Sequence, residues 1–337
     1  MLKKNQKKEQ KSLLTMDCSR RDFLRGPAVV AAGFAMGGMF KSCAATPQSA
    51  QPDPLQIEME EIARSFLRSP ANDMGFPTAE PLWGEPIFGV ASGADSLWMV
   101  FKETAVGSYH WTPREAFLLA FPQETAVQPE DLSVLVWVLP QTSATREDSR
   151  RQTRFPAERW VRSRWPGETL NISLRNHMVD ELVRREIQAV APNRLPEFST
   201  GRWSPFGLAC SFSERHAAYA AGLGTFSLSD GLITSVGKAH RVGAVVLRAR
   251  MEPTPRPYTT HKEYCLFFKD GSCGVCISRC PAGSVRAEGR DKELCASHLF
   301  GTTMPFVEET WGWSNQYGCG LCQVGVPCES RIPLGVI

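Results

Sequence analysis

The sequence predicts a mixed α/β (α+β) core followed by a smaller, cysteine-rich C-terminal domain. Strand-like and helix-like patterns alternate between residues 57 and 250, which favours a core built from both kinds of element. Eight of the eleven cysteines fall between residues 265 and 328. Because 337 residues suffice for about two domains, we expect the core over 57–250 and the second domain over 251–337.

The first 44 residues have the pattern of an export signal. A lysine-rich leader precedes Arg20 and Arg21, which are followed by Phe-Leu and a moderately apolar run over 26–40. Paired arginines in this setting are typical of a twin-arginine (Tat) signal. The run is shorter than the roughly 20 residues that cross a bilayer. We therefore predict Tat export to the periplasm or the outer face of the cytoplasmic membrane, with no permanent transmembrane span. Whether Cys43 is lipidated stays open.

The charge balance depends on this segment. Residues 1–44 carry nine Lys/Arg and three Asp/Glu, so the rest of the chain has 29 basic and 32 acidic residues. The formal net charge changes from +3 to −3. A nucleic-acid partner needs a basic surface and is not expected. Residues 45–56, rich in proline and glutamine, are predicted to be a linker.

Four segments of the core have clear patterns. Residues 57–68 and 168–185 show helical spacing of apolar side chains. Residues 132–139 (LSVLVWVL) are apolar almost throughout, which predicts a strand that is buried on both faces and stops at Pro140. A short strand is expected over 188–191, before the next proline.

The second half of the core has turn signals between its elements. Ser213 is expected to cap a helix that runs through Tyr219 and stops at Gly222-Leu223-Gly224. Residues 232–234 and 242–247 are strand-like, and a glycine-containing turn separates them. They predict a β-hairpin.

The cysteines have the spacing of ferredoxin motifs. Cys273, Cys276 and Cys280 are separated by two and three residues, and a proline follows the third, as in bacterial ferredoxins. Close spacing lets neighbouring thiolates reach different irons of one cube, while the cysteine before proline points to the other cluster. Eight thiolates suffice for two 4Fe-4S clusters. The predicted metal ligands are Cys265, Cys273, Cys276 and Cys328 for one cluster, and Cys280, Cys295, Cys319 and Cys322 for the other.

Two outer ligands depart from the ferredoxin pattern. An ordinary repeat would place a cysteine where Asp270 stands, so Cys265 must reach in from further away. Cys328 lies five residues beyond the preceding cysteine and follows Pro327. Four-cysteine zinc sites or disulfides are the alternatives, but a three-residue spacing followed by proline favours iron-sulfur binding. Such clusters perform electron transfer, so we expect an electron-donor protein or membrane redox partner.

Six segments together resemble epoxyqueuosine reductases and reductive dehalogenases over roughly residues 130 to 332. They are 213–224 (SERHAAYAAGLG), 231–234 (GLIT), 241–245 (RVGAV), 280–281 (CP), 291–295 (DKELC) and 317–323 (YGCGLCQ). The resemblance implies a nitroreductase-like core that holds a corrinoid (cobalamin-type) cofactor beside a ferredoxin-like domain with two 4Fe-4S clusters. It implies an oxidoreductase in which electrons pass to cobalt and then to a small-molecule substrate. It also places Arg241, Gly222 and Gly224 in the corrinoid region.

The chain departs from the family at the proposed proton donor. Epoxyqueuosine reductases have an aspartate about six residues before the Glu-Arg pair, where this chain has Leu208. Ser227-Leu228 stands in place of the family's Gly-Lys pair. Tyr219 is the candidate catalytic acid, with an ordinary pKa of about 10, and core packing is its alternative role. An exported, net-negative chain does not fit a tRNA substrate.

Seven arginines between residues 146 and 164 allow two interpretations. They could receive an anionic group, such as a corrinoid phosphate or the phosphates of a nucleotide, or they could form a solvated surface with the neighbouring acids. The arginines are Arg146, Arg150, Arg151, Arg154, Arg159, Arg162 and Arg164. For the whole chain two hypotheses remain: an exported, corrinoid-dependent reductase, or a non-catalytic 4Fe-4S electron carrier or partner subunit that binds no corrinoid.

Overall fold

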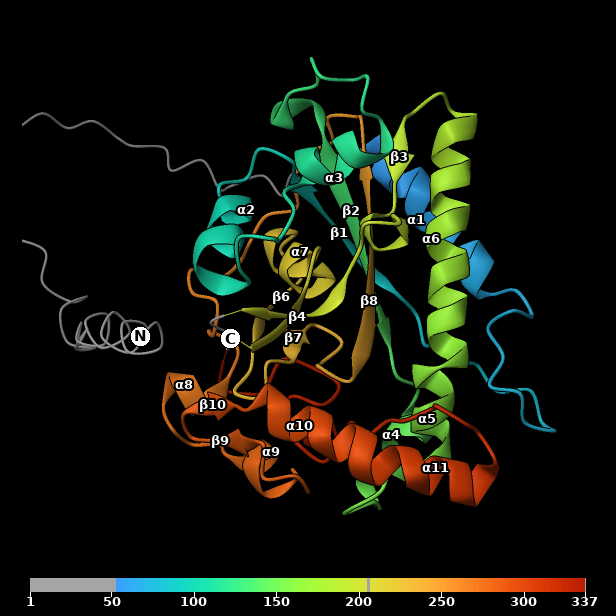
Figure 1. The fold of residues 1–337 in the computed structure, drawn as a ribbon, viewed down its shortest axis with the longest axis vertical. Helices are drawn as coiled ribbons and strands as arrows, with labels where there is room; N and C mark the ends of the chain where they lie inside the picture. Colours follow the sequence, from blue (N-terminus) through green and yellow to red (C-terminus); the bar gives the residue numbers. More distant parts are fainter. Residues whose placement is uncertain (1–52, 205–206, 337) are drawn as a thin grey trace, which may run out of the picture. The chain divides into compact units, whose positions relative to one another are not determined.

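The centre of the fold is an antiparallel sheet with the strand order β1-β2-β8-β3 (Figure 1). The computed structural model describes residues 53–204 and 207–336, so the predicted export signal over 1–44 lies outside the described residues. The predicted mixture of helices and strands is confirmed, and the antiparallel pairing makes the core α+β in kind. The strands are β1 (Ile87–Ser92), β2 (Ser133–Pro140), β8 (His240–Leu247) and β3 (Ala189–Val190).

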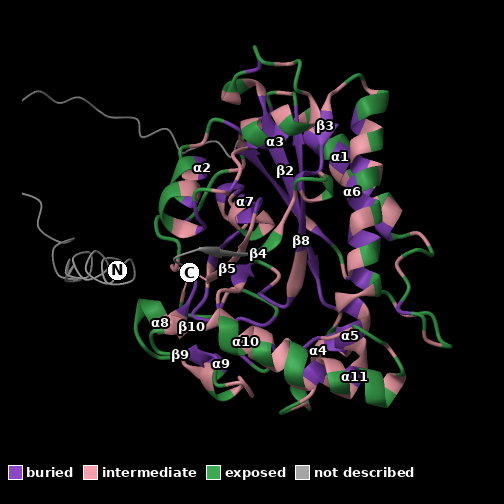
Figure 2. Cartoon of the chain, viewed as in Figure 1, coloured by how far each residue is buried: buried purple, intermediate pink, exposed green. Residues whose placement is uncertain are grey.

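Strand β2 is buried along its whole length, as predicted for 132–139 (Figure 2). Its side chains alternate between two separate hydrophobic clusters, because successive strand residues point to opposite faces. Val134 and Val136 pack on one side, whereas Leu135 and Trp137 pack on the other. Gly243 on β8 lies opposite the indole of Trp137, and a Cβ there would stand 2.3 Å from a ring carbon. A close approach of the two strands therefore needs glycine.

Helices cover both faces of this sheet (Figure 1). Helices α1 (Pro54–Leu67) and α6 (Pro166–Arg184) supply one cluster, and α3 (Pro113–Ala120) and α7 (Glu214–Ala220) supply the other. The short helix α2 (Leu97–Val100) joins the second group. The side chain of Asp53 accepts a hydrogen bond from the Leu55 amide at 2.8 Å and caps α1. The helix therefore begins inside the predicted linker, three residues before its expected start.

The predicted hairpin of residues 232–234 and 242–247 is wrong. Strand β7 (Leu232–Thr234) pairs with β6 (Gly224–Phe226), whereas β8 pairs with β2 and β3 in the central sheet. The turn at Gly237 exists, with φ of +79° and a Thr234 amide that donates to the Gly237 carbonyl at 3.1 Å. The long apolar β8 buries both faces in the sheet, which leaves β7 to the nearer strand β6.

Most of the remaining elements gather at one end of the sheet (Figure 1). Arg279 donates from its guanidinium to the carbonyl oxygens of Ser149 at 3.1 Å and Gln152 at 3.0 Å, which attaches the C-terminal segment to α4. The carboxylate of the buried Glu329 accepts from Arg150 Nε at 2.9 Å. The elements are α4 (Ser143–Arg150), α5 (Glu158–Arg164), β4 (Thr200–Ser204), β5 (Gly207–Cys210), α8 (Leu266–Lys269), α9 (Val275–Ser278), β9 (Val285–Arg286), β10 (Gly289–Arg290), α10 (Lys292–His298) and α11 (Met304–Trp311).

In the described part of the chain, no helix combines the length and the apolar character that crossing a bilayer requires.

Candidate functional site

The structure divides the eight clustered cysteines between two pockets. Their members are the same as those of the two predicted ligand sets, and all eight side chains are free thiols. The first quartet, Cys265, Cys273, Cys276 and Cys328, lines a small pocket. The second quartet, Cys280, Cys295, Cys319 and Cys322, lines a large cavity of about 400 Å³.

Local turns bring the first quartet together. Cys265 precedes helix α8, and Lys269 at the end of that helix donates its amide to the Cys265 carbonyl at 3.0 Å. Asp270 then accepts from the Ser272 amide at 2.9 Å, and Gly271 takes a left-handed φ of +74°. The chain reverses there and returns to Cys273. Asp270 thus shapes the turn at the position where a ferredoxin repeat has a cysteine.

The second quartet is held by polar contacts and by close packing. The guanidinium of Arg290 donates to Cys295 Sγ at 2.9 Å, and the Ser284 hydroxyl lies 3.2 Å from Cys280 Sγ. Gly320 has φ of +68° and rests against the indole of Trp160, where a Cβ would stand 1.9 Å from a ring carbon. Only glycine fits at that position.

Burial disfavours free thiolates in both pockets. It raises the pKa of Cys276 to about 11 and that of Cys319 to about 12. Coordination to a metal is the ordinary means by which such thiols become deprotonated. Among the residues that the structure describes, no group of three or more His, Cys, Asp or Glu side chains could hold a metal ion. A 4Fe-4S cluster binds its four thiolates on four different irons, so its ligands surround a volume and do not meet at one point.

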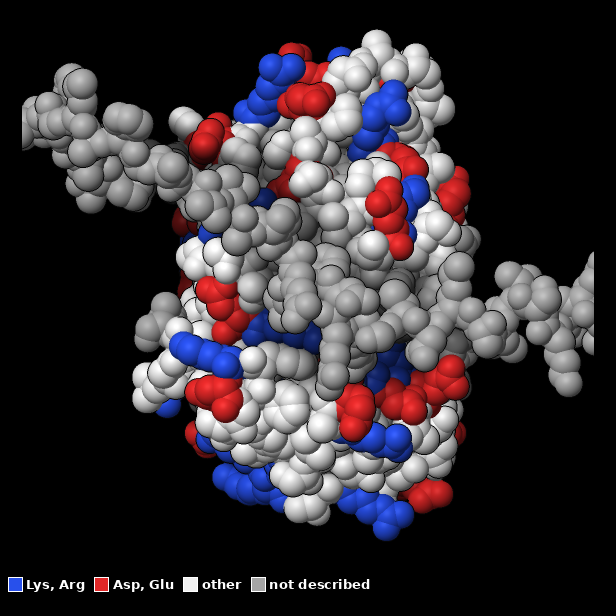
Figure 3. All heavy atoms as spheres, turned by 90° about the vertical axis from the view of Figure 1, so that its left-hand side faces the viewer, with Lys and Arg blue, Asp and Glu red and all other residues white. Residues whose placement is uncertain are grey.

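The lining of the large cavity is cationic. Its described lining residues include no Asp or Glu, whereas acidic and basic side chains lie side by side on the outer face in Figure 3. The aromatic side chains of Trp160, Phe300 and Tyr317 also line it. The cationic lining residues are Arg164, Arg215, Arg241, Arg290 and Lys292. This cavity can hold an anionic group beside a flat apolar one.

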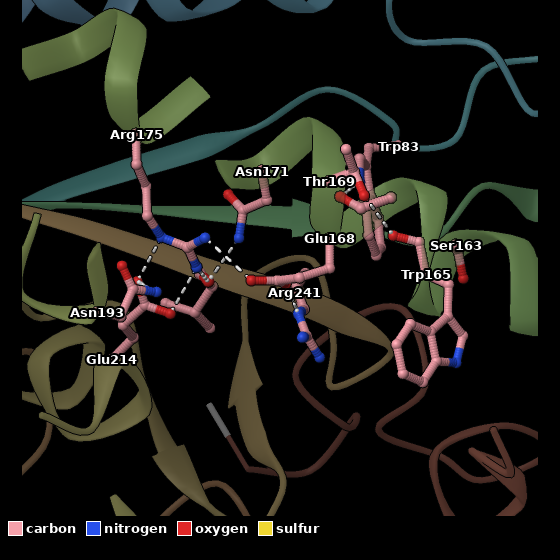
Figure 4. Close-up of polar contacts among 12 residues, drawn as sticks. Trp83, Ser163, Trp165, Glu168, Thr169, Asn171, Arg175, Asn193, Glu214 and Arg241 are labelled. Carbon is pink, nitrogen blue, oxygen red and sulfur yellow. Dashed lines mark hydrogen bonds and ion pairs between the residues drawn. The ribbon is translucent and has the colours of Figure 1, made fainter. Parts of the chain in front are cut away.

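A chain of ion pairs connects the core to this cavity (Figure 4). Arg241 pairs with Glu168, whose other oxygen lies 3.0 Å from Arg175 Nη1. Arg175 is 1% exposed and also binds Glu214, with Nη2 2.8 Å from Oε2. Glu214 accepts in addition from the Ala244 amide at 3.1 Å. Residues from α6, α7 and β8 thus fix the position of the Arg241 side chain.

The pKa values of Glu214 and Glu168, the two carboxylates in this series of ion pairs, are shifted in opposite directions. Burial raises the pKa of Glu214 in spite of its contact with Arg175. Burial would also raise the pKa of Glu168, but the guanidinium groups of Arg241 and Arg175 together hold it below its usual value. A carboxylate with two cationic partners stays ionised more readily than one with a single partner.

The predicted cofactor-binding and catalytic residues separate into two places. Arg241 lines the large cavity, together with Leu208 from the expected proton-donor position. Gly222 and Gly224 are not brought to this cavity: a Cβ on Gly222 would stand 2.6 Å from the Pro255 carbonyl oxygen, and one on Gly224 would stand 2.0 Å from that of Ile233. Their absent side chains allow close backbone packing.

Tyr219 also lies away from the large cavity. It lines a neighbouring cavity of about 560 Å³, whose wall shares Arg215 and Arg290 with the first. Its ring stacks on that of Tyr258 with centroids 5.2 Å apart, and burial raises its pKa. A phenol with a raised pKa donates a proton less readily.

Two residues in these pockets escaped the sequence prediction. Tyr317 was part of a matched segment, but the structure places it in the large cavity, where the Arg164 guanidinium lies 5.5 Å from its ring centroid. Lys238 lines the small pocket of the first quartet. Burial would lower its pKa, but the surrounding cysteines raise it. A lysine in the turn between two apolar strands was the sequence signal that could have identified it.

Most of the arginine-rich segment forms ion pairs with carboxylates of the same chain. Arg146 and Arg150 bind Glu329, and Arg159 binds Glu80 with Nε 2.8 Å from Oε1. Arg164 differs, because it lines the large cavity. Neither interpretation of this segment holds for all of it. Most of these arginines form ion pairs within the protein, whereas Arg164 lines the cavity.

Comparison with known proteins gives a relative in sequence. The chain is similar to epoxyqueuosine reductases. It is 31% identical over 120 residues to the epoxyqueuosine reductase of Listeria monocytogenes serovar 1/2a. This alignment covers 34% of the chain and 29% of that relative. No family model matches the chain. The resemblance expected from the motifs is thereby confirmed over about a third of the sequence.

Solved structures of both predicted groups are similar to the chain. An epoxyqueuosine reductase from Bacillus subtilis has a TM-score of 0.44 and 19% identity, covering 84% of this chain and 67% of its own. An epoxyqueuosine reductase solved with a modified tRNA stem loop has a TM-score of 0.45 and 18% identity, covering 84% of this chain and 67% of its own. A catabolic reductive dehalogenase has a TM-score of 0.45 and 12% identity, covering 86% of this chain and 39% of its own.

Proposed function

We propose that this protein is an exported iron-sulfur oxidoreductase. In this proposal the two cysteine quartets of a ferredoxin-type domain over residues 251–337 would hold two 4Fe-4S clusters, which would supply electron transfer towards a corrinoid and a small-molecule substrate. The observation that carries the proposal is the division of the eight cysteines into two quartets, each lining one pocket. A donor protein or membrane redox partner would supply the electrons, and the predicted Tat signal would place the protein in the periplasm.

The residues of both quartets fit clusters in their chemistry. Each quartet supplies four sulfur donors, which is the ligand number of a 4Fe-4S cluster. The guanidinium of Arg290 already donates to Cys295 Sγ at 2.9 Å. Hydrogen bonds to cluster sulfur and nearby positive charge stabilise the anionic thiolates and favour the reduced state.

The large cavity fits a corrinoid by its lining. Trp160 and Phe300 offer flat apolar surface, and Arg164 and Arg241 offer positive charge for a phosphate group. A corrinoid would supply the low-potential cobalt chemistry that removes a substituent from an organic molecule. The ion pair with Glu168 holds Arg241 in one orientation. The Arg241 side chain would therefore lose little conformational entropy when a phosphate group binds.

The proton for a reductive step needs a source in this chain. Leu208 has no ionisable group, and Tyr219 lies in the neighbouring cavity. Tyr317 is the phenol that lines the large cavity, with a cationic guanidinium beside its ring. We propose Tyr317 as the group that holds a transferable proton there, and solvent as the source that replaces it.

The second candidate function is a 4Fe-4S electron carrier or partner subunit without a corrinoid. Leu208 supports it, because a carrier needs no acid in the cavity. Both candidates require the two clusters. They differ in whether the large cavity holds a corrinoid and a substrate.

The test is anaerobic purification followed by measurement of iron, acid-labile sulfide, zinc and corrinoid. We expect about eight irons and eight sulfides per chain, together with a corrinoid detected by mass spectrometry. Two clusters without a corrinoid after reconstitution would favour the carrier. Stoichiometric zinc without sulfide would refute both candidates.

Two matched substitutions test the ligand assignment. Cys276→Ser should remove the cluster of the first quartet and spare the other, and Cys319→Ser should do the reverse. The electron paramagnetic resonance (EPR) signals of the reduced protein identify which cluster remains. Cys210→Ser is the control, because Cys210 belongs to neither quartet and its thiol donates to the Phe212 carbonyl at 3.3 Å. Loss of neither cluster in Cys276→Ser would contradict the assignment.

A further inference from the structure

Lys238 is a buried lysine at the boundary between the core and the cysteine pockets. It stands two residues before strand β8, and its side chain is 1% exposed. Its backbone amide donates to the Cys328 carbonyl at 2.9 Å, which fixes the lysine beside the first quartet. Its ammonium donates to the hydroxyl of Ser229 at 3.1 Å, and Ser229 is itself buried.

The surroundings of this ammonium lack a carboxylate partner. Within the described ranges 53–204 and 207–336 its side-chain partners are the Ser229 hydroxyl and the Cys328 thiol, and neither is a carboxylate. Lys238 lines the pocket of the first quartet, and the groups that raise its pKa are the cysteines Cys328, Cys322, Cys276 and Cys265. Three of these belong to the first quartet, and Cys322 belongs to the second. The lysine therefore lies next to one pocket and within electrostatic reach of the other.

An unpaired buried ammonium strongly destabilises a fold, so a lysine persists in such a place when negative charge accompanies it. The Ser229 hydroxyl and the Cys328 thiol, which are the side-chain partners of the ammonium, do not balance a full charge while both are neutral. Four thiolates around a cluster do, because a 4Fe-4S cluster with its cysteine ligands is anionic and becomes more so on reduction. Positive charge nearby favours the reduced form, and the effect is large where water is excluded.

We propose that Lys238 raises the reduction potential of the cluster held by the first quartet. This inference rests on the proposed function, because it requires that the quartet bind a cluster. In the step concerned, the oxidised cluster gains one electron from the donor, and no bond to carbon forms or breaks. The ammonium stabilises the added negative charge and so makes this cluster easier to reduce.

The alternative is that Lys238 serves only to fill space beneath the turn. Lys238→Met tests the two roles, because methionine keeps most of the length and removes the charge. Lys238→Gln removes the charge but keeps a hydrogen-bond donor towards Ser229. Lys238→Arg keeps the charge and changes the shape. Ser229→Ala removes the hydroxyl partner and leaves the charge in place.

The experiment is an EPR-monitored redox titration of the full chain with dithionite as reductant, preceded by iron and sulfide analysis. The signal that disappears in Cys276→Ser marks the cluster of the first quartet. In Lys238→Met and Lys238→Gln we expect the equilibrium constant for electron uptake by this cluster to fall at least about tenfold. For a one-electron couple this is a change of about 59 mV to more negative potential. The other cluster should change less, and Lys238→Arg should stay within about threefold of the unsubstituted protein.

The outcomes separate the inference from the function on which it rests. If the unsubstituted protein binds no clusters, the proposed function is wrong. If it binds two and the neutral variants leave both potentials unchanged, the role of Lys238 is overturned. Loss of the first cluster in both neutral variants, with retention in Lys238→Arg, would support the need for its charge. Loss in all three lysine variants would show that shape matters instead and would overturn the inference.

Discussion

Replacing Arg175 by methionine should destabilise the fold strongly. Arg175 is 1% exposed and holds Glu214 and Glu168, with the nearest nitrogen-oxygen distances at 2.8 and 3.0 Å. Methionine fills much of the same volume but leaves two inward-facing carboxylates without this partner. Removing one member of a buried ion pair typically costs about 3–5 kcal/mol. For a domain of this size that corresponds to a melting temperature lower by about 10 °C.

The assay is thermal unfolding followed by circular dichroism, with two comparison variants. Arg175→Met combined with Glu214→Gln should regain much of the loss, because the isolated buried charge is then absent. Arg184→Met is the surface control: the Arg184 side chain is 58% exposed, and its pair with Glu181 should contribute less than about 1 kcal/mol. A loss in Arg175→Met no larger than in Arg184→Met, or a double variant no more stable than the single, would refute the reasoning.

Two further predictions concern pH and backbone shape. Burial lowers the pKa of His110 from 6.5 to about 4, so the unfolded chain binds a proton there between these values and the folded chain does not. The His110 contribution, about 3 kcal/mol, is therefore complete above pH 6.5 and lost as the pH falls to 4. The unfolding free energy of His110→Gln should depend less on pH in this window; equal slopes would contradict it. Gly320→Ala should lower the iron content of the purified protein by about half, because the new Cβ would stand 1.9 Å from Trp160. The control is Gly312→Ala, at a position with φ of +71° and no heavy atom within 4 Å of the new Cβ; its free energy of unfolding should fall by about 1–2 kcal/mol and its iron content should not change. Equal iron contents in the two variants would refute the packing argument.

The elements that the sequence predicted well are those whose own pattern of apolar residues indicates which positions are buried. Strand β2 has apolar side chains at almost every position, and both of its faces are covered by helices. Helix α6 shows the same agreement, because its apolar spacing marks its buried side. The pairing of β7 could not be predicted, since a strand of three residues, two of them apolar, fits any neighbouring strand edge. Its partner β6 was available because Gly224 lets the two backbones approach.

The candidate site followed the sequence where spacing dictated geometry. The close spacing of Cys273, Cys276 and Cys280 distributes these thiols between two pockets, as the ferredoxin pattern predicts. Tyr317 and Lys238 were missed because neither belongs to a spacing pattern. They reach the pockets through folding, which brings Arg164 to Tyr317 across about 150 residues. Gly222 and Gly224 were placed with the cofactor by resemblance, but their own packing turns them towards backbone.

Under the proposed function, the charges of the described residues would favour electron delivery over proton delivery. Cys322, in the second quartet, lies within the electrostatic reach of both Lys238 and Arg290. Arg290 also lines the large cavity, where it lies near Arg164 and other cations. Each of these charges stabilises an added electron and opposes an added proton. A reductase built in this way would have to take its proton from a neutral group such as Tyr317 or from water, because a carboxylic acid among these cations would stay ionised. A carboxylic acid at position 208 would therefore stay ionised and donate no proton, so the leucine there deprives the cavity of no working proton donor.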